Sequence, residues 1–331
     1  MTKKYGFLLF VCLLVATTDA FSATWKRIYI PGAKCGNGSA FSVFVRPNSP
    51  DKLLIEFMGG GACWDQASCL YRTWIYPVPQ LNSYGAMTDQ TNPLNPFKDS
   101  STIYIPYCTG DVYAGDYTAQ YSISKINHWG HKNVRLALDH LVRSKIVDFK
   151  AFNDVAVLGS SAGAIGSLLH VKYIDGLLKP EARRTLIADS PGLHFGATFW
   201  DRFGTEARTS FQKAFDELGL RIDFNDGFIA RKIAPILDSL TNWKIGFLYG
   251  ERDAIMSEYF GQISKTDYQN LLLGAEGIVE TSKRYSNVNV WLSDSDNHIF
   301  LLFQDKYNSK SVDGVPAIGF VKNIHESNLG N

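Results

Sequence analysis

The sequence predicts an α/β protein, a three-layer sandwich in which helices cover both faces of a mostly parallel central sheet. Short apolar runs rich in β-forming residues recur along the chain, and helical patterns separate them. No internal repeat, low-complexity tract or Gly/Ser linker divides the sequence. We therefore expect one domain over residues 23–331.

The expected strands are the apolar runs, which contain many Val, Ile, Leu, Phe and Tyr residues. The first two flank Gly36-Asn37-Gly38 and predict a hairpin. The predicted strands are residues 25–30, 41–45, 52–57, 102–107, 155–158, 185–188, 245–249 and 288–292.

The expected helices lie between these runs. Val134, Leu138, Leu141 and Val142 share one helical face. The other predicted helices are residues 162–174, 211–218, 228–240 and 268–279. The segment 71–97 is rich in Pro, Asn and aromatic residues and is long for a loop, so we expect it to shape a binding site.

The N-terminus has the layout of a secretory signal peptide. Lys3 and Lys4 precede an apolar run over residues 6–16, and small residues including Ala20 and Ser22 follow. We assign residues 1–22 to this signal and expect a secreted, extracellular protein, or a periplasmic one if the source is a Gram-negative bacterium. No later run approaches about 20 apolar residues, so no stable membrane anchor is expected.

Charge and cysteine content narrow the class further. The formal net charge of +1 provides no field that favours nucleic acid, and the sequence leaves the oligomeric state open.

The mature chain keeps four cysteines, which predicts two disulfides in an oxidising compartment, with four free thiols as the alternative. Three pairings are possible; Cys63 and Cys69 can close a small loop, which leaves Cys35 with Cys108.

Gly159-Ser160-Ser161-Ala162-Gly163 matches the G-x-S-x-G pattern. An expected strand precedes it and an expected helix follows, which is the context of a nucleophile elbow. In such an elbow a sharp turn presents the serine hydroxyl above the sheet, and the helix N-terminus favours developing negative charge. An ordinary glycine-rich turn is the alternative, but the context favours Ser161 as a nucleophile.

Gly59-Gly60-Gly61 follows an earlier strand, where hydrolases with this elbow place the second donor of the oxyanion hole. Glycines allow backbone N–H groups to face a substrate without an intervening Cβ. Alone the triplet indicates a flexible turn. Together with the elbow downstream, it indicates stabilisation of a tetrahedral oxyanion.

A serine hydroxyl needs a base, and His298 is the first choice because it follows the last expected strand, after the serine. His194 also follows a strand and is the main rival. We interpret the remaining candidates as surface, capping or mid-helix residues of helical segments: His128, His131, His140 and His170.

The acid that orients the histidine is expected between Ser161 and His298 in the chain. Asp253 follows the strand 245–249 and is the first choice, and Asp189, after the preceding strand, is the second. Asp294 and Asp296 are near His298 in sequence only. Each could equally be a solvated loop carboxylate.

No metal site or organic cofactor is expected. The chain has no His-x-x-x-His or Cys-x-x-Cys pair, and Asp294-Ser295-Asp296 lacks the frame of a calcium loop. The Gly59–Gly61 triplet lacks the spacing of a phosphate loop or dinucleotide fingerprint.

With these residues in view, the chain resembles the pectin acetylesterase family, which includes the Notum carboxylesterases. The resemblance rests on residues 57–64 with Cys69, 95–97, 105–115, 159–163 and 189–192, which extend with His298 over most of the mature chain. It implies an α/β-hydrolase-like fold, no metal, and hydrolysis of carboxylic esters. It also implies that Ser161 is the nucleophile, His298 the base and Asp253 the acid.

The resemblance assigns the oxyanion hole to Gly60, Gly61 and Ala62, and we add the Ala162 N–H from the elbow. Ala62 stands where an aromatic residue is common in the family, a replacement that widens the expected site. The expected substrate is an ester, with acetylated polysaccharide such as pectin first. The alternatives are a deacylase or lipase acting on longer acyl chains and a non-catalytic glycan-binding protein on the same fold.

Overall fold

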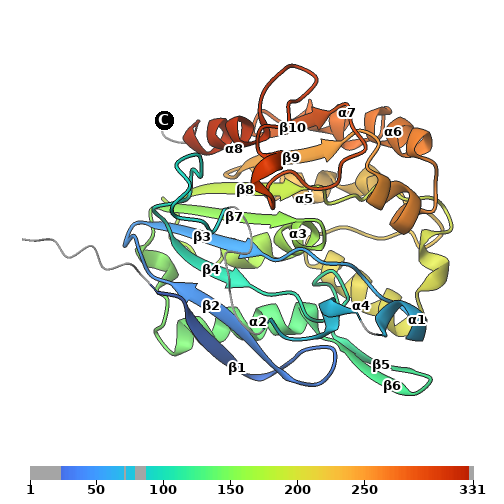
Figure 1. Cartoon of the computed structure of the whole chain (residues 1–331), viewed down its shortest axis with the longest axis horizontal. Helices are drawn as coiled ribbons and strands as arrows, with labels where there is room; N and C mark the ends of the chain where they lie inside the picture. Colours follow the sequence, from blue (N-terminus) through green and yellow to red (C-terminus); the bar gives the residue numbers. More distant parts are fainter. Residues whose placement is uncertain (1–23, 71, 79–86, 328–331) are drawn as a thin grey trace, which may run out of the picture.

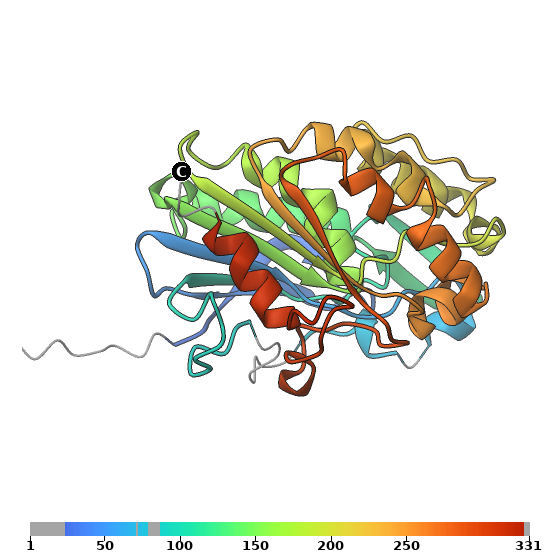
Figure 2. The same cartoon turned by 90° about the horizontal axis from the view of Figure 1, so that it is seen from above.

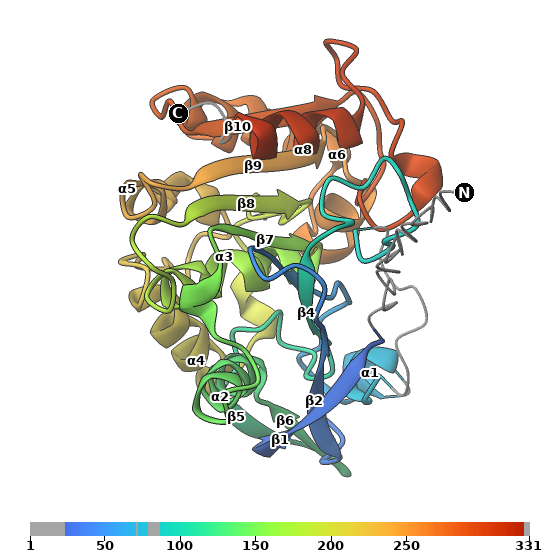
Figure 3. The ribbon, with the colours of Figure 1, turned by 90° about the vertical axis from the view of Figure 1, so that its left-hand side faces the viewer.

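A computed structural model describes residues 24–70, 72–78 and 87–327, so the predicted signal peptide lies outside the described residues. An eight-stranded sheet runs through the molecule in the order β1-β2-β4-β3-β7-β8-β9-β10 (Figures 1 and 3). β1 pairs antiparallel with β2, and β2 with β4; the other neighbours are parallel. The mostly parallel sheet expected from the sequence is therefore present.

Each of the eight predicted strands corresponds to a strand of this sheet, with ends that shift by a few residues. The strands are β1 (Lys26–Lys34), β2 (Ala40–Arg46), β3 (Lys52–Phe57), β4 (Ser101–Ile105), β7 (Asp154–Ser160), β8 (Arg183–Asp189), β9 (Lys244–Gly250) and β10 (Val288–Ser293). Every residue of β7 is buried, as expected for a parallel strand covered on both faces.

Helices cover both faces of the sheet. Val155 and Val157 of β7 face the larger core with α2 (Gly130–Arg143) and α3 (Ala162–Asp175). Ala156 and Leu158 face a smaller core with α8 (Ala317–Glu326), a helix that the sequence did not predict. Figure 2 shows α8 and α3 on opposite sides of the strands. This alternation is the period of two that a strand imposes.

The prediction for His128 is wrong. His128 was assigned to a helical segment, but the chain forms an antiparallel hairpin of β5 (Tyr117–Tyr121) and β6 (Ser124–His128). The His128 ring is buried and stacks on Tyr117 with 4.8 Å between centroids. His131, in α2, is also buried rather than a surface residue.

Three predicted helices have different ends. The helix expected from residue 211 starts earlier, as α4 (Thr205–Asp216). The segment 228–240 divides into a 3-10 turn, η4 (Ile229–Lys232), and α5 (Ala234–Asp238). The segment 268–279 divides into α6 (Lys265–Leu273) and α7 (Ile278–Ser282). Between them a Cβ on Gly277 would lie 2.3 Å from the Leu272 carbonyl, so the chain turns there on a glycine.

Short elements and two disulfides complete the described part of the fold. They are α1 (Gln66–Cys69), the 3-10 turns η1 (Thr73–Ile75), η2 (Phe149–Ala151), η3 (Phe199–Arg202) and η6 (Gln304–Lys306), and a π-helical turn, η5 (Ile255–Gly261). Cys35 pairs with Cys108 and Cys63 with Cys69, the pairing that the small-loop argument predicts. Among the described residues, no helix has the length and apolar character needed to cross a membrane.

Candidate active site

Ser161 stands on a strained turn between β7 and α3. Its φ of 57° and ψ of −123° fall in a region that non-glycine residues rarely adopt. The turn is held because the Ser161 N–H donates to the Asp189 carbonyl at 2.8 Å, and the Ser161 carbonyl accepts from Ala164 N–H. This strand, strained serine and helix form the elbow that the sequence indicates.

The glycines on either side of Ser161 are required by close packing. A Cβ on Gly159 would lie 2.0 Å from the Gly163 carbonyl oxygen, and a Cβ on Gly163 would lie 2.1 Å from that of Phe57. Because the clashing atoms are backbone, no side-chain movement relieves them. The two glycines let α3 start directly against β3 and β7, which sets the position of Ser161.

Ser161 opens into a pocket whose walls are almost entirely apolar. The pocket holds about 690 Å³ of space between atoms, open mouth included, and six phenylalanines and a tryptophan line it. The bulky lining residues come from α3, the segment 193–203, α4, η4 and η5: Ile165, Leu193, Phe195, Phe199, Trp200, Phe203, Phe211, Phe215, Ile229, Met256 and Phe260.

Most of the predicted oxyanion residues lie beside Ser161 in this pocket. Gly60, Ala62 and Ala162 line it together with Ser161. Ala162 is the first residue of α3, so its N–H has no partner in a preceding helical turn. Gly61 is outside the lining, and a Cβ on it would lie 2.7 Å from the Trp74 ring.

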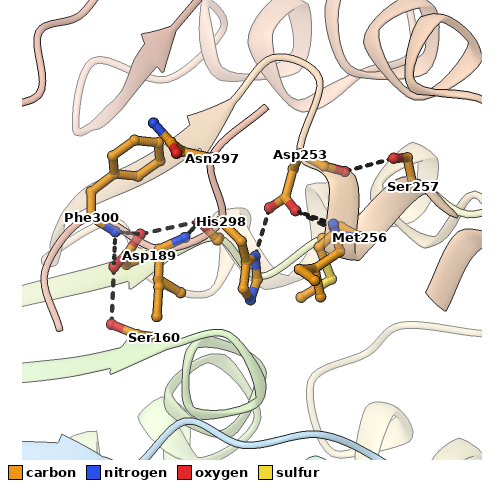
Figure 4. A network of polar contacts seen from close by, with 12 residues as sticks. Ser160, Asp189, Asp253, Met256, Ser257, Asn297, His298 and Phe300 are labelled. Atoms are coloured by element: carbon orange, nitrogen blue, oxygen red, sulfur yellow. Dashed lines mark hydrogen bonds and ion pairs between the residues drawn. The ribbon is translucent and has the colours of Figure 1, made fainter. Parts of the chain in front are cut away.

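A partly exposed His298 and a buried Asp253 form a hydrogen-bonded pair. Nδ1 of His298 lies 2.7 Å from Oδ2 of Asp253, which is fully buried (Figure 4). The other oxygen, Oδ1, accepts from the N–H groups of Ile255 and Met256, both at 3.0 Å. These two donors at the start of η5 hold the carboxylate against the ring. A proton on Nδ1 leaves Nε2 as the basic nitrogen.

The rival residues have other partners. The Asp189 carboxylate is bonded elsewhere than to the His298 ring: it accepts from Ser160 Oγ and from the backbone N–H groups of Phe300 and Leu301. His194 is fully buried, where Nδ1 donates to the Gly192 carbonyl and Nε2 accepts from Ile278 N–H.

The acidic residues near His298 in sequence point away from it. Asp294 and Asp296 are exposed and form ion pairs with Arg252 at 2.6 and 3.0 Å. Asp294 and Asp296 are therefore close to His298 in sequence, but their carboxylates are paired with Arg252 and not with the His298 ring.

Within the described part of the chain, one group of possible metal ligands is present, but its sulfurs are already bonded to each other. Ligand atoms of Cys63, Cys69 and His128 lie within 4.8 Å of one another. Cys63 and Cys69 are joined as a disulfide, so neither supplies a thiolate. Nδ1 of His128 bonds the Thr109 carbonyl and Nε2 bonds the Tyr121 hydroxyl.

The sequence predictions missed the apolar pocket and the hydrogen bonds that Asp189 makes. A signal for the pocket exists: Phe195, Phe199, Trp200, Phe203, Phe211 and Phe215 fall within 21 residues outside any strand. So dense an aromatic segment after a nucleophile elbow indicates a binding surface. No sequence pattern shows that one carboxylate receives donors from residues more than 100 positions away.

Comparison with known proteins identifies relatives of this chain. The family model of pectinacetylesterase matches residues 23–221. A palmitoleoyl-protein carboxylesterase Notum of Schmidtea mediterranea is 28% identical over 165 residues, 46% of this chain and 30% of that protein. The Drosophila melanogaster protein of the same name is 25% identical over 162 residues, 45% of this chain and 24% of that protein. The matched segment thus spans less than a third of either curated relative.

A solved structure extends the likeness to the whole fold. The structure of the Wnt deacylase Notum from Drosophila superposes with a TM-score of 0.65 and covers 91% of this chain and 93% of that chain, at 16% sequence identity. At this identity the superposition establishes the α/β-hydrolase-like fold.

Proposed function

The chain belongs to the pectinacetylesterase family, and on this premise we propose that it is a secreted serine carboxylesterase with Ser161, His298 and Asp253 as its catalytic triad. The observation that carries the proposal is the joint presence of a strained Ser161 elbow and a hydrogen bond between His298 and the buried Asp253. The two disulfides support export to an oxidising compartment.

In the proposed reaction, Nε2 of His298 takes the hydroxyl proton of Ser161 as Oγ attacks the ester carbonyl carbon. The carbonyl oxygen becomes an oxyanion, stabilised by N–H groups of the Gly60–Ala62 segment and of Ala162. The protonated His298 then gives its proton to the departing alcohol oxygen as the ester C–O bond breaks, which leaves an acyl-enzyme. Water activated by His298 releases the carboxylic acid and regenerates Ser161.

The pocket favours an acyl chain longer than acetyl. Among the described lining residues, four side chains carry oxygen or nitrogen: Ser161, Asp111, Tyr117 and Trp200. The Asp111 carboxylate already accepts from Thr109 Oγ1, Tyr113 N–H and Gly130 N–H, and the remaining lining side chains are apolar. An alkyl chain in such a pocket gains about 0.8 kcal/mol for each CH₂ removed from water. The curated relatives are named as carboxylesterases of palmitoleoyl-protein, in agreement with this preference.

Release of acetate from an acetylated polysaccharide such as pectin is the second candidate. The family model favours it, because its description names pectin acetyl esters and it covers the elbow and the glycine segment. If acetate release is the function, the apolar pocket accommodates only the methyl group of the acetyl ester near Ser161. The two candidates share the same chemistry and differ in the acyl group and the alcohol.

A chain-length series of aryl esters, from acetyl to palmitoyl, distinguishes them when acetate release from acetylated pectin is measured alongside. We expect kcat/KM to rise about tenfold or more for each two added carbons until the pocket is full. A maximum at acetyl, with acetate released from pectin, would select the second candidate. Wild-type esterase activity in Ser161→Ala would reject the triad altogether.

A further inference from the structure

Asp189 lies between the nucleophile and the segment that carries His298. It is the last residue of β8, next to the Ser160 end of β7. Its backbone carbonyl accepts from Ser161 N–H at 2.8 Å, and Oδ2 of its side chain accepts from Ser160 Oγ at 3.0 Å. One fully buried residue therefore holds the elbow through its main chain and its side chain.

The same residue also holds the chain directly after His298. Phe300 N–H donates to both carboxylate oxygens, at 2.9 and 3.1 Å, and Leu301 N–H donates to Oδ2 at 2.9 Å. Ile299 N–H donates to Ser190 Oγ at 3.0 Å, and that hydroxyl lies 3.2 Å from Oδ1 of Asp189. Three consecutive N–H groups thus converge on Asp189 and its neighbour, and Figure 4 shows the bonds from Phe300 and Ser160 to the Asp189 carboxylate.

The segment held in this way is strained. Ile299 has a φ of 57°, a left-handed conformation that is costly for a β-branched residue. Ser190, which bonds it, also has a φ of 57°. Without an anchor, residue 299 would relax toward a more favourable backbone conformation, and the His298 ring would move with it.

The partners of the carboxylate match its charged form. Ser160, Ser190, Phe300 and Leu301 all donate to it. Burial raises the pKa of the Asp189 carboxyl, and the N–H and hydroxyl donors act in the opposite direction. A neutral amide at this position would present its NH₂ to donors and lose part of the network.

We propose that Asp189 is a positioning residue, which fixes His298 relative to Ser161 by bonding the elbow and the strained turn at Ile299 at the same time. This role rests on the proposed function, because it matters only if Ser161 and His298 act together. Asp189 acts through its hydrogen bonds to the elbow and to the backbone after His298, rather than through a hydrogen bond to the His298 ring.

The test is Asp189→Asn, with Asp154→Asn as the matched control. Asp154 is also buried, but it begins β7 at the far end of the strand, where it pairs with Arg183. We expect Asp189→Asn to lower kcat about 100-fold with KM within about threefold, the cost of a catalytic group displaced by about 1 Å. We expect Asp154→Asn to lower thermal stability and to leave kcat unchanged.

Two readouts separate positioning from stability. First, Asp189→Asn should react with a fluorophosphonate probe to one label per molecule, but at a rate reduced in parallel with kcat. Second, Ile299→Gly in the Asp189→Asn background should recover about tenfold of the lost kcat, because glycine adopts a positive φ without strain. If Asp189→Asn does not fold, Ser190→Ala takes its place, with an expected loss of about tenfold.

Wild-type kcat in folded Asp189→Asn would overturn the positioning role. The role would also be overturned if the loss of activity were explained entirely by a smaller fraction of molecules that react with the fluorophosphonate probe. It would be overturned as well if Ile299→Gly recovered no kcat in the Asp189→Asn background. Ser161→Ala is measured in parallel. If that variant keeps wild-type activity, the proposed function fails; if it is inactive while Asp189→Asn is fully active, only the positioning role fails.

Discussion

The imidazole Nδ1 of His298 lies 2.7 Å from the Asp253 carboxylate, although 45 residues separate the two in sequence. β9 and β10 are parallel neighbours, with Gly250 opposite Ser293. The loops that follow the two strands therefore leave the same edge of the sheet. Asp253 and His298 therefore meet at the edge of the sheet where β7 ends, directly before Ser161.

Replacing Asp253 with Asn should remove most activity and leave the fold intact. The amide can still accept from Ile255 and Met256 N–H, but it favours a proton on Nε2 of His298, the nitrogen that must act as base. We expect kcat to fall about 10³- to 10⁴-fold, with KM nearly unchanged. Steady-state kinetics and circular dichroism on the same preparation check this, and near wild-type kcat would remove Asp253 from the triad.

Ala62→Phe should shorten the acyl chain that the enzyme prefers. Ala62 lines the apolar pocket beside Ser161 and is nearly buried, so a phenyl group there would occupy space that an alkyl chain otherwise fills. We expect kcat/KM for octanoyl esters to fall about tenfold or more, and that for acetyl esters to stay within about threefold. Ala62→Ser, which adds only a hydroxyl, is the matched control. An unchanged chain-length profile in Ala62→Phe would show that the acyl group binds elsewhere.

The two disulfides should contribute differently to stability and activity. The Cys35–Cys108 bond closes a span of 73 residues, and its removal as Cys35→Ala/Cys108→Ala should cost about 4 kcal/mol of unfolding free energy. The Cys63–Cys69 bond spans only 6 residues and should cost about half as much. Because Cys63 lines the pocket directly after Ala62, we expect only the second variant to lose kcat while folded. Urea unfolding and esterase assays check both; equal losses of kcat in the two variants would contradict this division.

Acidification should destabilise the protein through its buried histidines. Burial lowers the pKa of His128 and of His194 from 6.5 to about 4. The unfolded chain therefore binds protons at these positions before the folded chain does, and stability is lost as the pH falls from about 6.5 to about 4. Each histidine accounts for up to about 3 kcal/mol of this loss.

His194→Gln provides the check on this pH dependence. Urea midpoints measured between pH 7 and pH 5 should decline less steeply in the variant than in the wild type, because one titrating group is gone. The variant starts from a lower stability at pH 7, since it disturbs the bonds to Gly192 and Ile278. An identical slope in the two proteins would mean that His194 does not control the acid response.

The sequence alone determined the elements whose pattern is local. The eight strands of the sheet and the elbow at Ser161 follow from apolar runs and from glycines at residues 159 and 163, because strand burial and a tight strand–helix turn constrain the residues that form them. The order of Ser161, Asp253 and His298 in the chain was likewise sufficient to nominate all three.

The tertiary structure decided which of these groups meet. Asp189 and Asp253 each come at or after the end of a strand and look equivalent in sequence. The packing of β8 between β7 and β9 decides their partners: the Asp189 carboxylate bonds backbone N–H groups, and the Asp253 carboxylate bonds the His298 ring. The phenylalanine pocket beside Ser161 also depends on contacts between distant segments, as does the docking of the β5–β6 hairpin, where Asn127 N–H donates to the Gly36 carbonyl. Side-chain partners separated by tens of residues are set by how the layers pack, and no local pattern in the chain encodes that geometry.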